Sequence, residues 1–289
     1  MKTSPIVGLT LNYRDPIRTV DCVVSILNDD IKHVLIWDNS EDGGLSSNQI
    51  RSMLPEESHI TIEVSHINLG FAAGVNQGLK WIRTHYPGAR VLLINNDAHL
   101  LIGASGALFS ALEENIEAVL AYPSINHGGK PRGTIFYNSY LALLTNQNSL
   151  PGSFPFSSGC CQMIALDRYE GDLYDEDFFM YGEDTELGFR LGETRMVHVP
   201  DVWVCHEGSA SSGIATSFYE SRMVAAHWLI AQKIAVNRYH LFILYGCRVV
   251  MLLARSFLRG CRYRSWIPVR SLWIGWRIAH SHQRLASRP

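Results

Sequence analysis

Residues 90–97 read RVLLINND, a compact apolar run that ends in two asparagines and an aspartate. The run Val91–Ile94 is short and unbroken, as in a strand covered on both faces of a parallel sheet. Similar runs occur at 5–11 (PIVGLTL), 33–37 (HVLIW), 60–64 and 118–122. Between them lie stretches with helical spacing, at residues 16–27, 72–84 and 104–115. This alternation predicts βαβ units, a largely parallel sheet and an α/β fold.

Polar residues follow the predicted strands, at the sheet edge where α/β proteins bind their ligands. Asp38 follows the second strand, where a carboxylate accepts hydrogen bonds from a base or ribose, or closes an Asx turn. Asp97 follows Asn95 and Asn96, and together they suit a hard cation that already carries diphosphate oxygens. A polar turn is the alternative. The other polar groups after strands are Asn12-Tyr13 and Asn68-Leu69-Gly70-Phe71.

Three glycines, Gly70, Gly74 and Gly78, recur every four residues. This spacing is not G-x-G-x-x-G, and no G-K-[ST] follows, so neither a dinucleotide fingerprint nor a P-loop is indicated. The glycines would line one helix face. Close packing on the sheet explains that face about as well as a ligand does.

An acidic and aromatic cluster occupies residues 175–186, DEDFFMYGEDTE. Glu183 and Asp184 would open a helix, where carboxylates cap the N-terminus and gain from the helix dipole. Capping does not explain the whole cluster, and a carboxylate beside an apolar wall is also a candidate general base. His206 follows a predicted strand and is a candidate metal ligand, although a lone histidine is more often structural.

The composition excludes several classes of protein. The chain has 289 residues, 47% of them hydrophobic and 18% charged, which excludes a disordered or collagen-like chain. None of its 6 cysteines forms a C-x-x-C pair, so a zinc ribbon or a thioredoxin motif is not expected. The N-terminus shows no signal-peptide pattern. The expectation is a cytoplasmic protein with reduced thiols.

Charge is distributed unevenly along the chain. Residues 1–208 carry 13 basic and 26 acidic side chains, a balance of −13, whereas residues 209–289 carry 12 basic side chains and one acid, a balance of +11. This predicts an acidic body at 1–212 and a basic, apolar helical region at 213–289, with a break at Gly260 and a kink at Pro268. Such a basic region points to an anionic partner.

The basic region resembles a membrane-surface helix. Arg248, Arg255, Arg259 and Arg262 are spaced to share one helix face, and Leu241, Leu244, Tyr245, Leu252 and Leu253 form another. Tryptophans 266, 273 and 276 follow. A basic amphipathic helix with tryptophans is typical of an anionic membrane surface. The alternative is a helical extension packed on the body or on a second copy in a homodimer. A nucleic-acid partner is not expected, because the region is too apolar.

Seven stretches together resemble the family 2 inverting glycosyltransferases, particularly the bacterial rhamnosyltransferase-like branch. The stretches are LTLNYRDP (9–16), VLIWDNS (34–40), NLGFAAGVNQGL (68–79), LLINNDA (92–98), SGCCQMI (158–164), YDEDFFMYGEDTELGFR (174–190) and VWVCHEGSAS (202–211). They occur in the order of the family. The resemblance implies a GT-A fold, a Rossmann-like and mostly parallel sheet with flanking helices, and a nucleotide-diphosphate sugar donor.

The resemblance also assigns roles to residues. Asn12, Tyr13 and Asp38 would surround the base and ribose, and Asn68, Gly70, Phe71 and Asn76 would shape the donor pocket. Asn95-Asn96-Asp97 matches the D-x-D position, with Asp97 and His206 as the ligands of Mg²⁺ or Mn²⁺. Asp184 matches the general base, with Glu183 as the alternative, and Gly159 borders the acceptor. Asn95 replaces an aspartate that many relatives carry, which weakens the expected metal dependence.

The implied activity is transfer of a sugar, preferably L-rhamnose from dTDP-L-rhamnose, onto a saccharide or polyprenyl-diphosphate-linked acceptor. The product would belong to a bacterial surface polysaccharide of the O-antigen or lipopolysaccharide type. The enzyme would act at the cytoplasmic face of the inner membrane as a peripheral protein. Two alternatives are a UDP-hexose or other donor on the same fold, and a catalytically inactive sugar-nucleotide-binding scaffold.

Overall fold

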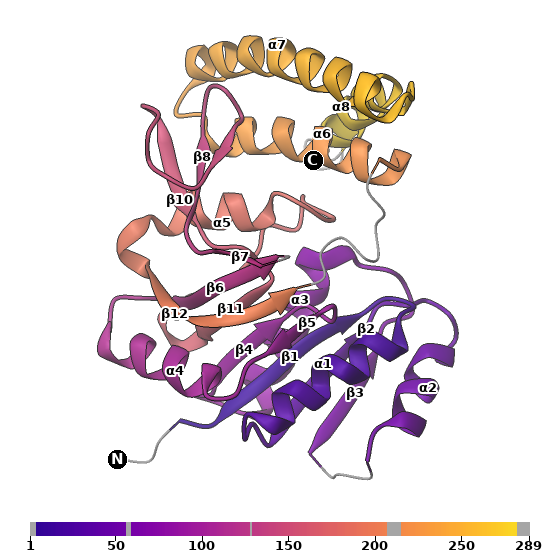
Figure 1. The fold of residues 1–289 in the computed structure, drawn as a ribbon, viewed down its shortest axis with the longest axis vertical. Helices are drawn as coiled ribbons and strands as arrows, with labels where there is room; N and C mark the ends of the chain where they lie inside the picture. Colours follow the sequence, from indigo (N-terminus) through magenta and orange to yellow (C-terminus); the bar gives the residue numbers. More distant parts are fainter. Residues whose placement is uncertain (1–3, 56–58, 128, 207–214, 282–289) are drawn as a thin grey trace, which may run out of the picture.

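A mixed sheet forms the centre of the molecule (Figure 1), whose computed structural model describes residues 4–55, 59–127, 129–206 and 215–281. The strand order is β3-β2-β1-β4-β11-β6-β12-β5, and β7 pairs with β6. These strands are β1 (Ile6–Asn12), β2 (His33–Asp38), β3 (Ile60–Val64), β4 (Arg90–Ile94), β5 (Ala98–Leu100), β6 (Leu120–His127), β7 (Lys130–Arg132), β11 (Cys161–Ala165) and β12 (Met196–His206).

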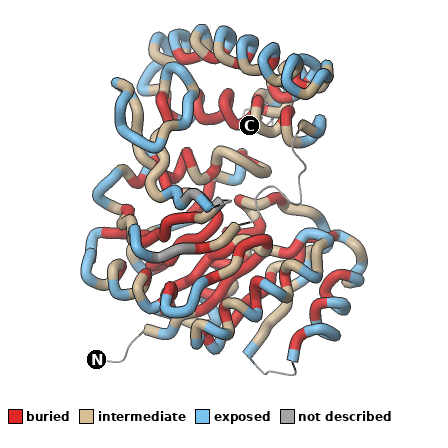
Figure 2. Tube along the Cα trace, viewed as in Figure 1, coloured by how far each residue is buried: buried red, intermediate tan, exposed pale blue. Residues whose placement is uncertain are grey.

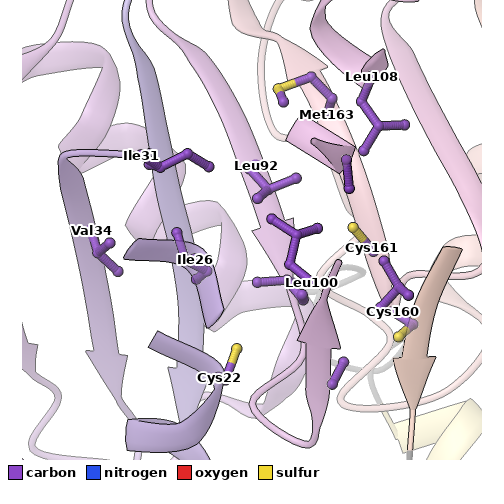
Figure 3. Close-up of a cluster of buried hydrophobic side chains, with 14 of the residues drawn as sticks. Cys22, Ile26, Ile31, Val34, Leu92, Leu100, Leu108, Cys160, Cys161 and Met163 are labelled. Atoms are coloured by element: carbon purple, nitrogen blue, oxygen red, sulfur yellow. The ribbon is translucent and has the colours of Figure 1, made fainter. Parts of the chain in front are cut away.

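Helices cover both faces of this sheet. One face packs against α1 (Pro16–Asn28), α2 (Leu45–Met53) and α4 (Ala104–Glu114), and Figure 3 shows side chains of this core around Leu92 and Met163. The other face packs against α3 (Gly70–His85) and α5 (Glu183–Leu191). Val91–Ile94 of β4 is fully buried between the two cores, as its unbroken apolar run predicts.

The first half of the sheet is parallel, as the alternation of strands and helices predicts. The predicted largely parallel character is limited to this half, because β11 and β5 run antiparallel to their neighbours in the second half. β1 pairs in parallel with β2 and with β4, and β2 pairs in parallel with β3. Asn12 and Asp38 are direct partners in the β1–β2 register. The carboxyl ends of β1, β2 and β4 therefore meet at one edge, which positions the candidate site.

The second half of the sheet brings distant segments to the same edge. β11 runs antiparallel to β4 and β6, and β12 runs parallel to β6, with a register irregularity between Val199 and Trp203. A short β5 then pairs antiparallel with β12, so His206 lies opposite Ala98. That pairing places the end of β12 beside the turn that holds Asp97.

A third layer stands on top of the sheet. A small sheet of β8 (Ile135–Asn138), β9 (Leu144–Thr145) and β10 (Ser153–Phe156) packs with α6 (Ser217–Ile234), α7 (Arg238–Tyr263) and α8 (Ile267–Ser281) around a separate apolar core. α6 also contacts α5. The remaining elements are two short 3-10 turns, η1 (Leu166–Arg168) and η2 (Glu193–Arg195).

The basic region is helical, as expected, but two details differ from the prediction. α7 continues through Gly260, because tertiary packing outweighs the low helix propensity of one glycine. The predicted assignment of residues to the two faces of α7 is wrong, because Leu244 and Leu252 do not lie opposite the arginines. Arg248 is fully buried on the same side as Leu244 and Leu252, since backbone carbonyls of Tyr140 and His227 accept its hydrogen bonds.

Three arginines of α7, Arg248, Arg255 and Arg259, therefore face the protein. Arg255 Nη1 and Arg259 Nε each donate to the buried Glu220 of α6, at 2.9 and 2.7 Å. Figure 2 shows that the outer side of α7, the uppermost helix in this view, is largely exposed. Among the described residues, α7 alone meets the length and composition of a membrane span.

Candidate active site

The ends of β1 and β2 form a buried polar corner. Asp38 Oδ1 accepts hydrogen bonds from Asn12 Nδ2 at 2.8 Å and from the Ser40 amide at 3.1 Å. Asn12 Nδ2 also donates to Ser40 Oγ at 3.0 Å. The second carboxylate oxygen, Asp38 Oδ2, is buried without a hydrogen-bond partner in the described part of the chain. It can accept a hydrogen bond from a bound ligand.

A chain of hydrogen bonds joins this corner to the end of β4. Thr19 Oγ1 donates to Asn12 Oδ1 at 2.8 Å and accepts from Asn96 Nδ2 at 3.1 Å. The next residue, Asp97, is nearly buried, and its Oδ1 lies 2.9 Å from His206 Nε2. The structure therefore brings together Asp97 and His206, which are 109 positions apart in the sequence.

The same edge continues to the base candidate. The Asn95 amide donates to the Cys160 carbonyl at 2.8 Å, and the neighbouring Gly159 amide donates to Asp184 Oδ2 at 3.3 Å. Asn95 Oδ1 is buried and has no partner among the residues described. One continuous set of contacts, made of these hydrogen bonds and of neighbours in the chain, thus connects eight predicted residues: Asn12, Asp38, Asn95, Asn96, Asp97, Gly159, Asp184 and His206.

Asp184 is oriented by the start of α5. Its Oδ1 accepts a hydrogen bond from the Thr185 amide at 2.7 Å, and its side chain is only half-buried. Burial raises the pKa of the Asp184 carboxyl, while the hydrogen bonds from Gly159 and Thr185 lower it. A carboxylate that is held in place, reachable and more basic than usual suits a general base.

Glu183 has a different environment. Its side chain is buried, and Oε2 has no partner within the described ranges. Burial, followed by repulsion from Asp184, raises the pKa of the Glu183 carboxyl. Glu183 therefore favours its neutral form, which leaves Asp184 as the better placed of the two acids.

The start of α3 borders the base candidate. Gly70 has φ +80°, and a Cβ there would lie 2.3 Å from the Phe179 carbonyl oxygen, so only glycine fits. The Phe71 amide donates to that same carbonyl at 2.7 Å. A Cβ on Gly159 would lie 3.6 Å from the Phe71 ring and 3.7 Å from Asp184 Cβ. Phe71 and Gly159 therefore line the space beside the base.

The other two glycines of α3 serve packing. A Cβ at Gly74 would lie 2.7 Å from Asn39 Nδ2 and 2.8 Å from Leu11, and one at Gly78 would lie 2.6 Å from Leu9. Both glycines let α3 approach β1 closely. The ligand interpretation of this glycine face is therefore limited to Gly70.

The side chains of three predicted residues, Asn68, Asn76 and Tyr13, contact other parts of the structure. Asn68 accepts from the Gly70 amide at 2.9 Å and so shapes the start of α3. Asn76 is buried, and its amide atoms bind the Tyr174 backbone and Glu176, which anchors the acidic loop. Tyr13 follows β1 with its ring 38% exposed and the Arg14 guanidinium above it.

Sequence reasoning missed several residues that build the site. Thr19 and Ser40 complete the polar corner, and Ser40 could have been found because it directly follows Asp38-Asn39. Arg222 of α6 stacks over the Phe179 ring at 4.3 Å and fixes the loop that contacts Gly70. No local pattern identifies Arg222, because its contact depends on the packing of α6.

The end of β4 carries donors for a divalent cation. The Asp97 carboxylate and the His206 imidazole lie side by side, and Asn95, two residues before Asp97, has a buried amide oxygen without a partner among the described residues. Oxygen donors suit Mg²⁺ and Mn²⁺, and an imidazole favours Mn²⁺. No group of three His, Cys, Asp or Glu that could hold a metal occurs in the described residues. The set fits a cation whose remaining ligands are diphosphate oxygens and water.

This fold is the GT-A architecture that the sequence predicted, an α/β sheet flanked by helices with a C-terminal helical region. Solved structures of S. aureus TarS share it. TarS 1–349 aligns with a TM-score of 0.53 and 13% identity, covering 97% of this chain and 91% of that one. The same fragment in complex with UDP gives 0.53 and 12%, over 97% and 91%.

A longer TarS structure gives a TM-score of 0.52 and 11% identity, over 94% of this chain and 55% of that one. At these identities the likeness concerns the fold. Neither a protein-family model nor a curated protein sequence matches the chain.

Proposed function

We propose that this protein is an inverting glycosyltransferase that moves a sugar from a nucleotide-diphosphate donor onto a saccharide or polyprenyl-diphosphate-linked acceptor. One observation carries the proposal: a single network of contacts links the buried Asp38 corner, the Asp97–His206 pair and the oriented Asp184 carboxylate. TarS, which shares the fold, is a glycosyltransferase. The proposed product is a bacterial surface polysaccharide of the O-antigen or lipopolysaccharide type.

The preferred donor is dTDP-L-rhamnose, on the resemblance of the sequence motifs to the rhamnosyltransferase-like branch. A UDP-hexose is the second candidate, because the TarS fold has been solved with UDP. Thymine and uracil share an imide N–H, which the free Asp38 Oδ2 can accept. The Asp38 corner therefore serves either nucleotide, and the sugar pocket decides between them.

In the proposed mechanism Asp184 removes the proton from an acceptor hydroxyl. The resulting oxygen nucleophile attacks the anomeric carbon in line with the departing diphosphate, so the C–O bond to the diphosphate breaks and the configuration inverts. Gly159 and Thr185 hold the Asp184 carboxylate in place for this step. Neutral Glu183 adds no second negative charge beside the incoming hydroxyl.

Asp97 and His206, with the Asn95 oxygen, would hold Mg²⁺ or Mn²⁺. Such an ion neutralises the charge that develops on a leaving diphosphate. Asn12, Asn96 and Thr19 position Asp38 and Asp97 relative to each other through their side-chain hydrogen bonds. We place the enzyme at the cytoplasmic face of the bacterial inner membrane, as a peripheral protein.

The test is a thermal-shift panel of nucleotides and nucleotide sugars, with and without Mn²⁺, followed by a transfer assay. A ligand at 100 times its Kd adds about 2.7 kcal/mol of stability. We expect stabilisation by dTDP or UDP compounds that is weakened in Asp97→Ala. Asp184→Asn should keep this stabilisation and lose turnover about 100-fold or more.

The outcomes separate the alternatives. Stabilisation by UDP-hexoses alone would select the second donor. Donor binding without turnover on any acceptor would indicate an inactive sugar-nucleotide-binding scaffold. Full turnover in Asp184→Asn would exclude Asp184 as the base, and no shift with any nucleotide would overturn the proposed function.

A further inference from the structure

The outer face of α7 is apolar over most of its length. Every exposed residue between positions 239 and 258 is uncharged and apolar or small, and the set is Tyr239, Phe242, Ile243, Gly246, Val249, Val250, Leu253, Ala254, Phe257 and Leu258. Phe242 is 80% exposed and Phe257 is 68% exposed. At 1.5 Å per residue this face is about 30 Å long. Figure 2 shows it at the outer surface of the molecule.

The polar side of α7 is turned inward, the reverse of a surface helix in water. Arg248 is fully buried, and Arg255 and Arg259 bind Glu220. The apolar side is left without a partner on the described chain. A contiguous apolar patch of this length exceeds what a monomeric protein normally exposes to water, so it marks an interaction surface.

A lipid surface is the partner that fits the neighbouring residues. Trp266, directly before α8, and Arg270, Trp273 and Arg277 of α8 are all exposed and are spaced 4, 3 and 4 positions apart. Tryptophan and arginine together suit the headgroup region of an anionic bilayer, where the indole sits at the interface and the guanidinium binds phosphate. This stripe begins three residues after the end of α7.

A second copy of the chain fits less well. Both ends of the apolar face are basic, with Arg238 at the start of α7 and Arg262 and Arg264 at its end, and all three are exposed. Two copies joined through this face would bring like charges together in either orientation. Anionic lipid neutralises the same charges.

We propose that the apolar face of α7 and the Trp-Arg stripe of α8 form a lipid-docking surface that lies in the interface of an anionic bilayer. α7 lies along the membrane plane and does not cross it, because crossing would remove the Tyr140 and His227 carbonyls from Arg248. The surface accounts for the peripheral location proposed above. It is independent of sugar transfer, and its test does not require activity.

The test is flotation with vesicles of phosphatidylcholine containing one quarter phosphatidylglycerol. The variant Phe242→Gln, Val250→Gln, Phe257→Gln removes three exposed apolar side chains from α7. The control Leu45→Gln, Ile102→Gln, Ile116→Gln changes equally exposed apolar residues of the α/β body. We expect the α7 variant to bind vesicles at least about ten-fold more weakly, since each buried apolar side chain adds to the affinity. The control should bind like the wild type.

Folding of each variant is checked by its thermal unfolding, which exposed substitutions should leave nearly unchanged. Equal vesicle binding by the α7 variant and the wild type would overturn the proposal. So would a wild-type dimer that the α7 variant converts to a monomer in the absence of lipid, because the face would then bind a second copy.

Orientation is tested by a fluorescent probe on one introduced cysteine at a time, Phe242→Cys, Val250→Cys or Phe257→Cys, with the accessible Cys205, Cys247 and Cys261 replaced by serine. Lipids that carry a quencher at a shallow or a deep position then report the depth of the probe. A helix in the membrane plane predicts similar shallow depths for all three probes. A much deeper probe at position 250 would show that α7 crosses the bilayer, and would contradict the docking surface.

Discussion

Glu183 and Asp184 are neighbours at the first turn of α5, yet they differ in access and in partners. Asp184 accepts backbone hydrogen bonds and is half-buried, whereas Glu183 is buried with one oxygen unpartnered. An unpartnered buried carboxylate is stable in a protein mainly when it is protonated. The two adjacent acids therefore differ: Glu183 favours its neutral form, whereas Asp184 is reachable and is held by backbone hydrogen bonds.

This difference predicts how stability depends on pH. Burial and Asp184 raise the pKa of Glu183 to about 8, above its unfolded value of about 4.3. Between these values the folded state holds more protons, so stability falls as pH rises, by up to about 1.4 kcal/mol per pH unit. Glu183→Gln removes this loss. The gain in Tm of Glu183→Gln over wild type should therefore grow from pH 5 to pH 8 (roughly the window these pKa values span).

The matched control is Glu114→Gln, because Glu114 is an exposed glutamate on α4. Its Tm difference from wild type should stay constant over the same range. A constant difference for Glu183→Gln as well would mean that Glu183 ionises in the folded protein as it does in the unfolded chain. That result would contradict the neutral state assigned to Glu183 in the mechanism.

At the scale of elements, one buried acid joins α6 to α7. Glu220 is fully buried and binds Arg255 and Arg259. Glu220→Ala leaves two partly buried guanidinium groups without a carboxylate, which costs about 3–5 kcal/mol when such a buried pair is broken. We expect a loss of that size in urea unfolding. Asp172→Ala breaks the exposed Lys80–Asp172 pair and should cost about 1 kcal/mol or less.

A loss of less than about 1 kcal/mol in Glu220→Ala would mean that apolar packing alone holds α7. The ion pairs of Glu220 with Arg255 and Arg259 would then contribute little to holding α7 in this orientation. The conservative change Glu220→Gln keeps the size and shape of the side chain but replaces one of the two acceptor oxygens with an uncharged NH2 group. It should fall between the wild type and Glu220→Ala.

The elements that the sequence predicts well are those defined by local pattern. β1, β2 and β4 are short apolar runs that are buried on both sides, and the polar residues that follow them do meet at one edge. α2 was not predicted, because only Leu45, Ile50 and Met53 in its nine residues are apolar. β8 and β10 were also missed, because each has only four residues and β10 contains Pro155, which is typical of a loop.

The orientation of α7 shows where local pattern fails. Its periodicity separates faces but does not say which face is inside, and isolated arginines usually face water. Here Glu220, 35 positions before Arg255, turns them inward. One signal was present in the sequence, because Glu220 is the single acid among residues 209–289. A single acid in a region with 12 basic residues indicates that this acid pairs with one or more of them.

At the scale of the whole molecule, charge and apolar surface are separated in the same direction. The body carries a balance of −13 and the region after residue 208 a balance of +11. On the proposed docking surface, an anionic bilayer would attract the end that holds α7 and α8 and repel the body, and so would orient the protein before any apolar contact forms. Each arginine near an anionic leaflet adds about 1 kcal/mol.

This separation predicts a salt effect that depends on the lipid. Raising the ionic strength from 0.1 to 1 M shortens the Debye length from about 10 to about 3 Å, so the electrostatic part of binding to phosphatidylglycerol vesicles should fall. Binding to pure phosphatidylcholine should be weak and insensitive to salt, because only the apolar face of α7 contributes there. Flotation at both ionic strengths measures this difference.

The variant Arg270→Gln, Arg277→Gln isolates the stripe on α8. It should lose most of the salt dependence and keep the binding to phosphatidylcholine, whereas the α7 variant should lose binding to both lipids. If Arg270→Gln, Arg277→Gln kept the salt dependence of the wild type, the attraction would come from other basic residues, and the Trp-Arg stripe would not face lipid. If salt had no effect on the wild type, charge separation would have no part in orienting the molecule.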